Sequence, residues 1–165
     1  MTENQELLDL AQKVLDDLTT RGLTLAIAES CTGGLASSVL TDFDGSSDVL
    51  LYSIVAYTSE AKEEFLGIPS YVLRDFGTIS IECAKLMAEG VLEYDADIGL
   101  ATTGVIGESI EDKLKGTVFI AVAVAGQKTF AKELVLDPKK SRHELKVEIV
   151  IDLFNSLFTA IESVY

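Results

Sequence analysis

Cysteine and histidine are scarce in this chain of 165 residues, which contains two Cys and one His. Cys31 and Cys83 are too few for a disulfide framework, and we interpret both as free thiols. One His and two Cys cannot form a conventional zinc site without carboxylates, and no Asp-x-Asp cluster resembles a metal-binding loop. We therefore expect neither a metal site nor a cofactor.

Basic residues are also few. Thirteen Lys and Arg stand against 27 Asp and Glu, which gives a formal net charge of −14. Such a surface repels phosphate backbones, so general nucleic-acid binding is disfavoured. The same imbalance makes any basic residue beside a pocket more informative.

Long apolar runs, linkers and repeats are missing as well. No apolar run reaches the length of a membrane span, and residues 1–8 are polar and acidic, unlike a secretory signal. Apolar residues nevertheless make up 48% of the chain, enough to exclude disorder. We expect one cytoplasmic domain over residues 1–165, without a membrane partner and with a full-sized core.

Helical and strand patterns alternate along the chain. Helix periodicity and capping residues (Thr58 or Ser59, Ser80, Ser141) predict helices at 5–20, 33–41, 59–66, 81–92 and 141–164, with a short turn or helix at 71–76. Apolar runs predict strands at 23–28, 50–58, 96–103, 116–124 and 128–136. A short Gly-containing connection makes the last two strands an antiparallel hairpin. The alternation predicts a three-layer α/β/α sandwich with a mixed sheet of about five strands.

The segment Ala28-Glu29-Ser30-Cys31-Thr32-Gly33-Gly34 lies between the first predicted strand and the following helix. A helix N-terminus offers unpaired N–H groups and a positive dipole end. Gly33 and Gly34 would let a ligand approach the backbone closely. The segment is therefore suited to bind an anion or a developing oxyanion, although Thr32 could equally be an ordinary helix cap.

Three segments should converge at one edge of the sheet, because ligands of open α/β sheets bind beyond the carboxyl ends of the strands. Residues 29–34, 57–62 and 102–107 each place polar residues or glycines directly after an apolar strand. This convergence is a stronger functional signal than any single motif.

Lys62 is the best candidate for a general base. It lies in the first turn of a predicted helix, where the positive dipole end would lower its pKa, and Tyr57 lies five residues before it. Two serines compete as its nucleophilic partner: Ser30 at the end of the first strand, and Ser47 in the loop before the second.

Other candidates have plainer interpretations. His143 opens the last helix, and a surface position fits it better than a Ser-His-Asp triad. Cys31 has no matching His, and we interpret it as a small buried residue. Arg142 and Lys146 lie one turn apart and are either solvated side chains or phosphate contacts. The guanidinium of Arg142 could bind a phosphate in a bidentate manner, with two N–H groups at once.

Several of these segments occur in the order and spacing of a known family. Over roughly residues 5–163 the chain resembles the CinA C-terminal domain family. The motifs that carry the resemblance are Ala28-Glu29-Ser30-Cys31-Thr32-Gly33-Gly34, Gly45-Ser46-Ser47, Tyr57-Thr58-Ser59-Glu60-Ala61-Lys62, Leu66-Gly67-Ile68-Pro69, Gly77-Thr78-Ile79-Ser80 and Gly116-Thr117-Val118. The first motif and the Tyr-x4-Lys element are specific together.

The resemblance implies a nicotinamide-nucleotide amidohydrolase. Such enzymes deamidate nicotinamide mononucleotide to nicotinic acid mononucleotide and ammonia, in pyridine nucleotide salvage. By motif position the resemblance points to a metal-independent serine amidase built from Ser47, Tyr57 and Lys62, with Ser30 close by. It favours Ser47 as nucleophile, whereas position at a strand end favours Ser30, and both serines are expected to line one pocket.

The resemblance also implies how a small nucleotide substrate is held, and that the protein is a homo-oligomer. The Thr103-Gly104 turn and Arg142 would hold the nucleotide. Independently of the resemblance, the glycines and the helix N-terminus make Thr32, Gly33 and Gly34 expected substrate-binding residues.

One loop departs from the family pattern. The family continues its third strand as Thr/Ser-Gly-Ile-Ala-Gly-Pro and a Gly-rich loop, whereas this chain has Thr103-Gly104-Val105-Ile106-Gly107-Glu108 and a short charged loop. A second interpretation therefore stays open, in which the chain is a non-catalytic nucleotide-binding or interaction module of the same family.

Overall fold

Five strands form one central sheet in the computed structural model, which describes residues 2–165. Their order across the sheet is β2-β1-β3-β4-β5. The strands are β1 (Leu25–Glu29), β2 (Leu50–Val55), β3 (Ile98–Gly104), β4 (Thr117–Val124) and β5 (Phe130–Val135). The predicted five-stranded sheet is confirmed.

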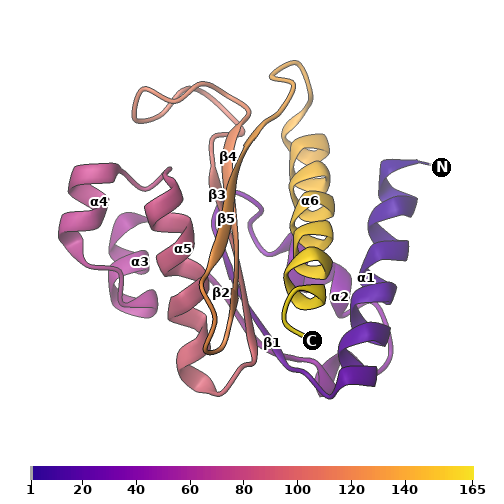
Figure 1. Ribbon diagram of the computed structural model, residues 1–165. Coiled ribbons are helices and arrows are strands. Elements are labelled where there is room, and N and C mark those ends of the chain that lie inside the picture. The colour runs from indigo at the N-terminus through magenta and orange to yellow at the C-terminus, as the bar shows by residue number, and fades with distance from the viewer. Residues whose placement is uncertain (1) are drawn as a thin grey trace.

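Parallel pairing brings three strand ends to the same edge of this sheet. Strand β1 pairs parallel with β2 and β3, so that Ala28 faces Ile54 on one side and Ala101 on the other. Strand β4 is antiparallel to β3, and β5 is antiparallel to β4, which completes the predicted mixed sheet and hairpin. The carboxyl ends of β1, β2 and β3 therefore meet at the edge that lies at the top of Figure 1.

Helices cover both faces of the sheet (Figure 1). On one face lie α1 (Glu3–Arg21), α2 (Leu35–Leu40) and α6 (Arg142–Glu162). On the other lie α3 (Ser59–Leu66), α4 (Ser70–Phe76) and α5 (Ile81–Gly90). Two short 3₁₀ helices, η1 (Ser46–Asp48) and η2 (Val91–Tyr94), complete the elements. The predicted three-layer α/β/α sandwich is confirmed, and none of the described helices is long and apolar enough to cross a membrane.

Three of these helices are capped at their N-termini by side chains of the predicted capping residues. The hydroxyl groups of Thr58, Ser80 and Ser141 each accept a backbone N–H of the first turn of α3, α5 and α6. Thr32 is different, because the N-cap of α2 is Gly34, which has no side chain to cap with. The interpretation of Thr32 as a helix cap is therefore wrong.

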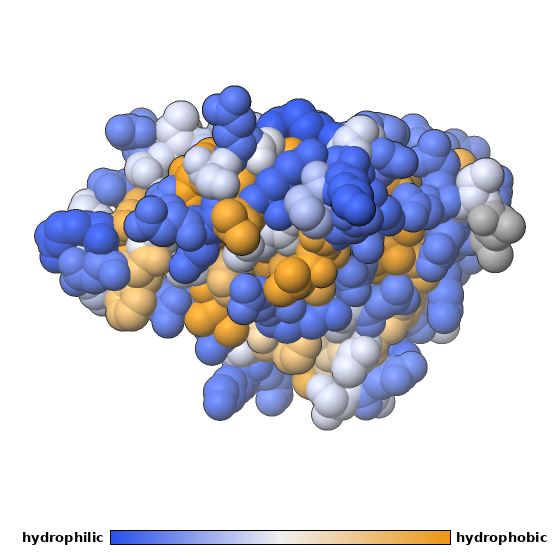
Figure 2. Space-filling model, turned by 90° about the horizontal axis from the view of Figure 1, so that it is seen from above, coloured by the Kyte–Doolittle hydropathy of each residue, from blue (hydrophilic) through white to orange (hydrophobic). Residues whose placement is uncertain are grey.

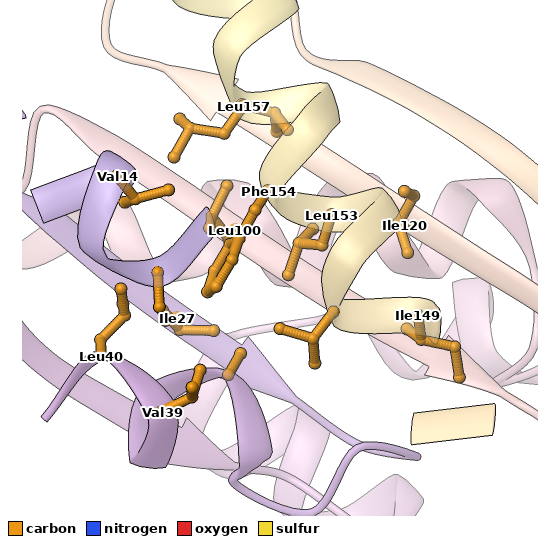
Figure 3. Close-up of a cluster of buried hydrophobic side chains, with 14 of the residues drawn as sticks. Val14, Ile27, Val39, Leu40, Leu100, Ile120, Ile149, Leu153, Phe154 and Leu157 are labelled. Atoms are coloured by element: carbon orange, nitrogen blue, oxygen red, sulfur yellow. The ribbon is translucent and has the colours of Figure 1, made fainter. Parts of the chain in front are cut away.

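The two faces of the sheet carry side chains of different size. Under α1, α2 and α6 the core is built from large residues such as Ile27, Leu100, Leu153 and Phe154 (Figure 3). Under α5 the sheet presents small residues, which are Ala26, Ala28, Ala101, Ala121 and Ala123 together with Gly99. Small side chains let α5 approach the sheet closely, and a Cβ on Gly99 would lie 2.1 Å from the carbonyl oxygen of Ala88 in α5.

We expect Gly99→Ala to lower the free energy of unfolding by about 2 kcal/mol or more, because the methyl group would push α5 away from β3. The matched control is Gly67→Ala, where a Cβ meets nothing within 4 Å and only the left-handed backbone (φ +64°) resists the change, at a cost of about 1 kcal/mol. Urea unfolding measures both. Equal losses in the two variants would show that the close contact at Gly99 is unimportant.

Candidate active site

A cavity of about 590 Å³ opens at the edge of the sheet where β1, β2 and β3 end. Three parts of the chain line it, as the sequence predicted: Ser30 and Cys31 after β1, residues 57–62 around the start of α3, and the loop from Thr103 to Glu111. Thr78, Ile79 and Arg142 complete the lining. Figure 2 looks onto this end of the molecule, where apolar residues show in gaps between hydrophilic ones.

Lys62 and Ser30 meet at the bottom of this cavity. The Nζ atom of Lys62 donates hydrogen bonds to Ser30 Oγ (3.1 Å) and to the carbonyl oxygen of Ala56 (2.7 Å). The Lys62 side chain is only 1% exposed, and Ser30 is 8% exposed. The carbonyl of Ala56 therefore holds the amine against the serine hydroxyl, at a distance that permits proton transfer.

Burial changes the protonation of Lys62. Removal from water disfavours the charged form and lowers the pKa of Lys62 below its ordinary value. No carboxylate forms a salt bridge with it within residues 2–165. Desolvation, rather than the helix dipole invoked from the sequence, is thus the main cause of the shift.

Tyr57 and Arg142 lie at the rim of the cavity. Tyr57 is 59% exposed, and its hydroxyl accepts a hydrogen bond of 3.3 Å from Arg142 Nη2. Neither Ser30 nor Lys62 shares a hydrogen bond with Tyr57 in the described part of the chain. The two rim residues are therefore placed to contact a substrate rather than to activate the serine directly.

The loop after β3 forms a wall of the cavity and is hydrogen-bonded to the segment that precedes α5. Glu111 accepts hydrogen bonds from Thr78 N (3.1 Å), Thr78 Oγ1 (2.7 Å) and Ile79 N (3.2 Å). Partial burial opposes ionisation of Glu111, but these hydrogen bonds outweigh it, and the pKa of this carboxyl lies below its ordinary value. Glu111 and Asp112 both have positive φ (52° and 60°), so the loop is held in a conformation that non-glycine residues seldom adopt.

Glu29 lies behind the cavity and is completely buried. Its carboxylate accepts hydrogen bonds from the backbone N–H groups of Gly34 (3.0 Å), Ala36 (3.2 Å) and Ser37 (2.9 Å), and from the hydroxyls of Thr32 (2.6 Å) and Ser37 (3.0 Å). The carboxylate thus does for α2 what a capping side chain does elsewhere.

The Thr32-Gly33-Gly34 turn does not line the cavity. The Thr32 hydroxyl is buried against Glu29 and Thr102, and Gly34 donates its N–H to Glu29. A Cβ on Gly33 would lie 3.3 Å from Lys146 Nζ, not beside the cavity. The prediction that these three residues bind substrate is wrong, because the carboxylate of Glu29 draws the turn inward.

Ser47 lies at the other end of the sheet. It belongs to η1, which precedes β2, whereas Tyr57 follows β2. A strand of six residues spans roughly 20 Å. Ser47 is exposed and does not line the cavity. The prediction that both serines share one pocket is therefore wrong, and Ser30 alone of the two contacts Lys62.

The cysteines are not nucleophiles at ordinary pH. Both thiols are buried. Burial is the largest influence on each, and it raises the pKa of Cys31 and of Cys83 to about 12. Among residues 2–165, no group of three or more His, Cys, Asp or Glu side chains is arranged to hold a metal ion.

Five contributors to the site were not named as site residues from the sequence, although Glu29 and Thr102 lie in the segments expected to converge there: Glu29, Ala56, Thr78, Thr102 and Glu111. A carboxylate directly after an apolar strand was a usable signal for Glu29, since such a residue needs donors when buried. The Ala56 carbonyl and the Thr78–Glu111 contact left no such signal, because they depend on how loops meet in space.

The model of the CinA C-terminal domain matches residues 7–158 of the chain. A CinA-like protein of Syntrophus aciditrophicus is 52% identical over 109 residues, which cover 64% of this chain and 26% of that protein. A CinA-like protein of Shewanella sp. (strain W3-18-1) is 39% identical over 155 residues, which cover 92% and 34%. The chain thus spans about a quarter to a third of the length of these curated relatives.

Solved structures have the same fold. The competence/damage inducible protein CihA from Agrobacterium tumefaciens superposes with a TM-score of 0.89 at 32% identity, over 93% of this chain and 94% of that one. A CinA superfamily protein from Escherichia coli superposes with a TM-score of 0.88 at 27% identity, over 96% and 92%.

We expect Lys62→Met to raise the free energy of unfolding at neutral pH by about 1–3 kcal/mol, because methionine brings no charge into the buried position. Folding lowers the pKa of Lys62, so between its folded and unfolded pKa values the unfolded chain binds more protons and wild-type stability rises with pH. The advantage of the variant should therefore be largest below the folded pKa and shrink as the pH approaches about 10.4. Urea unfolding across this pH range measures it.

Lys139→Met is the matched control, because Lys139 is exposed. Its effect should stay within about 0.5 kcal/mol and should not vary with pH. A Lys62→Met variant that is less stable than the wild type by the same amount at every pH would contradict a buried amine of lowered pKa.

Proposed function

The chain belongs to the CinA C-terminal domain family, and we propose that it is an amidohydrolase that deamidates nicotinamide mononucleotide to nicotinic acid mononucleotide and ammonia. Ser30 is the proposed nucleophile and Lys62 the proposed general base. One observation carries the proposal: a buried amine of lowered pKa lies 3.1 Å from a serine hydroxyl at the bottom of an open cavity.

The first half of the reaction forms an acyl-enzyme. Neutral Lys62 takes the hydroxyl proton of Ser30 as Oγ attacks the amide carbonyl, while one N–H of the amine stays on the Ala56 carbonyl. The backbone N–H of Cys31, which lines the cavity directly after Ser30, is the proposed donor to the developing oxyanion. The C–N bond then breaks, and Lys62 returns the proton to the leaving nitrogen, which departs as ammonia.

The second half releases the acid. Lys62 takes a proton from water, whose oxygen attacks the ester carbonyl of the acyl-enzyme. The bond to Ser30 Oγ breaks, Lys62 returns the proton to the serine, and the carboxylic acid leaves. The cycle uses no group beyond the chain and water.

Substrate contacts are proposed at the rim. Arg142 has no carboxylate partner within the described residues, and its planar guanidinium is suited to a phosphate. Tyr57, which accepts a hydrogen bond from Arg142, would lie beside the same group. The Thr103 hydroxyl donates its proton to the carbonyl oxygen of Thr78. The Thr103-Gly104 turn would therefore contact the nucleotide through its backbone groups rather than through the Thr103 side chain.

Two acidic residues in the cavity lining favour the second candidate, a nucleotide-binding or interaction module without catalysis. Glu108 and Glu111 line the same cavity as Arg142, and two carboxylates oppose the approach of a phosphate. Binding of nicotinamide mononucleotide without release of ammonia would support this candidate over the amidohydrolase.

We expect Ser30→Ala to reduce turnover by about a thousandfold or more, because it removes covalent catalysis. Ser47→Ala is the matched control and should change turnover less than about twofold, since an exposed serine at the far end of β2 contacts nothing in the cavity. Ammonia release from nicotinamide mononucleotide measures both. Mass spectrometry should locate an acyl adduct on Ser30, and an adduct on Ser47 would reverse the assignment.

Lys62→Arg should abolish measurable turnover, because a guanidinium keeps the charge but cannot act as a base at ordinary pH. In the wild type, kcat should rise with pH as Lys62 loses its proton, with a midpoint below the ordinary lysine pKa. Near-normal turnover of Lys62→Arg would remove Lys62 from the role of base.

A further inference from the structure

A buried row of side chains connects the backbone of Ser30 to the carboxylate of Glu29. Ser30 N donates to Thr102 Oγ1 (3.4 Å), the hydroxyls of Thr102 and Thr32 are 2.8 Å apart, and Thr32 Oγ1 donates to Glu29 Oε2 (2.6 Å). Thr32, Thr102 and Glu29 are all fully buried. The three side chains are shielded from water, so each hydroxyl proton must find a partner within the protein.

The direction of these hydrogen bonds follows from counting protons. Each threonine hydroxyl has one proton to donate. Thr32 donates its proton to the carboxylate of Glu29, so it can only accept in its contact with Thr102. Thr102 therefore donates to Thr32 and is left with a lone pair facing the N–H of Ser30. The row runs in one direction, from the backbone of Ser30 to the carboxylate.

The side chain of Thr102 bonds to Ser30 just beyond the point where the backbone pairing of β1 and β3 ends. The last paired residues of β1 and β3 are Ala28 and Ala101. Ser30 lies beyond that pair, and the side chain of Thr102 provides the contact from β3 that the backbone no longer makes. The hydrogen bond between Ser30 and β3 is thus made by a single hydroxyl group.

Glu29 also connects to Lys62 through the backbone. The N–H of Ala56 donates to the carbonyl of Glu29 (2.9 Å), and the carbonyl of Ala56 accepts from Lys62 Nζ (2.7 Å). Both members of the Ser30–Lys62 pair are therefore held relative to the same residue, one through the threonines and one through Ala56.

We propose that Thr102 is a positioning residue, whose hydroxyl, oriented by Glu29 through Thr32, holds the main chain of Ser30 within reach of Lys62. This inference rests on the proposed role of Ser30 as nucleophile. Thr102 does not line the cavity, so its loss should change the rate of reaction at Ser30 and leave substrate binding intact.

The test compares Thr102→Val, which keeps the shape and removes the hydroxyl, with Thr102→Ser, which keeps the hydroxyl. Thr102→Val should lower kcat roughly tenfold to a hundredfold, as expected for a misplaced nucleophile, with KM within about twofold. Thr102→Ser should restore most of kcat. A fluorophosphonate probe, which reacts with activated serines, should label Ser30 more slowly in Thr102→Val by a similar factor.

Thr24→Val is the matched control. The Thr24 hydroxyl donates to Asp97 (2.9 Å) just before β1, at the opposite end of the sheet. This variant also loses a partly buried threonine hydrogen bond, so it should lower the melting temperature while leaving kcat and the labelling rate unchanged.

Three results would overturn the inference: wild-type kcat and labelling in Thr102→Val, a loss confined to KM, or a loss that Thr102→Ser does not restore. Labelling also separates the two proposals. If the wild-type protein is labelled at Ser30 but releases no ammonia, the proposed deamidation of nicotinamide mononucleotide is refuted. The labelling rates of the variants would still decide the role of Thr102. A wild-type protein that is neither labelled nor active would refute both.

Discussion

The carboxylate of Glu29 is the interaction on which the site depends. A buried charge is tolerated only when hydrogen bonds replace the lost water, and this carboxylate has five donors from the turn and helix that follow it. Gly34 cannot cap α2 with a side chain, so Glu29 supplies the missing acceptor. These hydrogen bonds hold residues 32–37 against Glu29, while Ser30 lines the cavity.

Lys62 presents the opposite case, a buried basic group that forms no salt bridge with any carboxylate of residues 2–165. Its burial works against stability, since the charged form is disfavoured, yet the same desolvation makes the amine available as a base. The helix that carries it begins at Thr58, and the Ala56 carbonyl fixes its amine. Stability and reactivity are therefore coupled at this one side chain.

Local signals in the sequence were reliable where the structure they predicted was also local. The caps at Thr58, Ser80 and Ser141 fall where the chain predicted them, because a hydroxyl and an N–H three residues apart need nothing else. Ser47 shows the limit of such signals. Its place in a motif suggested a shared pocket with Lys62, but β2 lies between them and carries the chain to the other end of the sheet.

The sequence by itself determined the order of the elements, the three-layer α/β/α architecture and the edge at which the site lies. Periodicity is set by neighbouring residues, and the alternation of strands with helices predicts parallel strands whose carboxyl ends share one edge. Only the tertiary structure decided which serine meets Lys62, that Glu29 holds the turn, and that Thr102 reaches the backbone of Ser30. Those contacts join residues up to 72 positions apart. Their partners are selected by packing of strands and loops in space, which no spacing along the chain encodes.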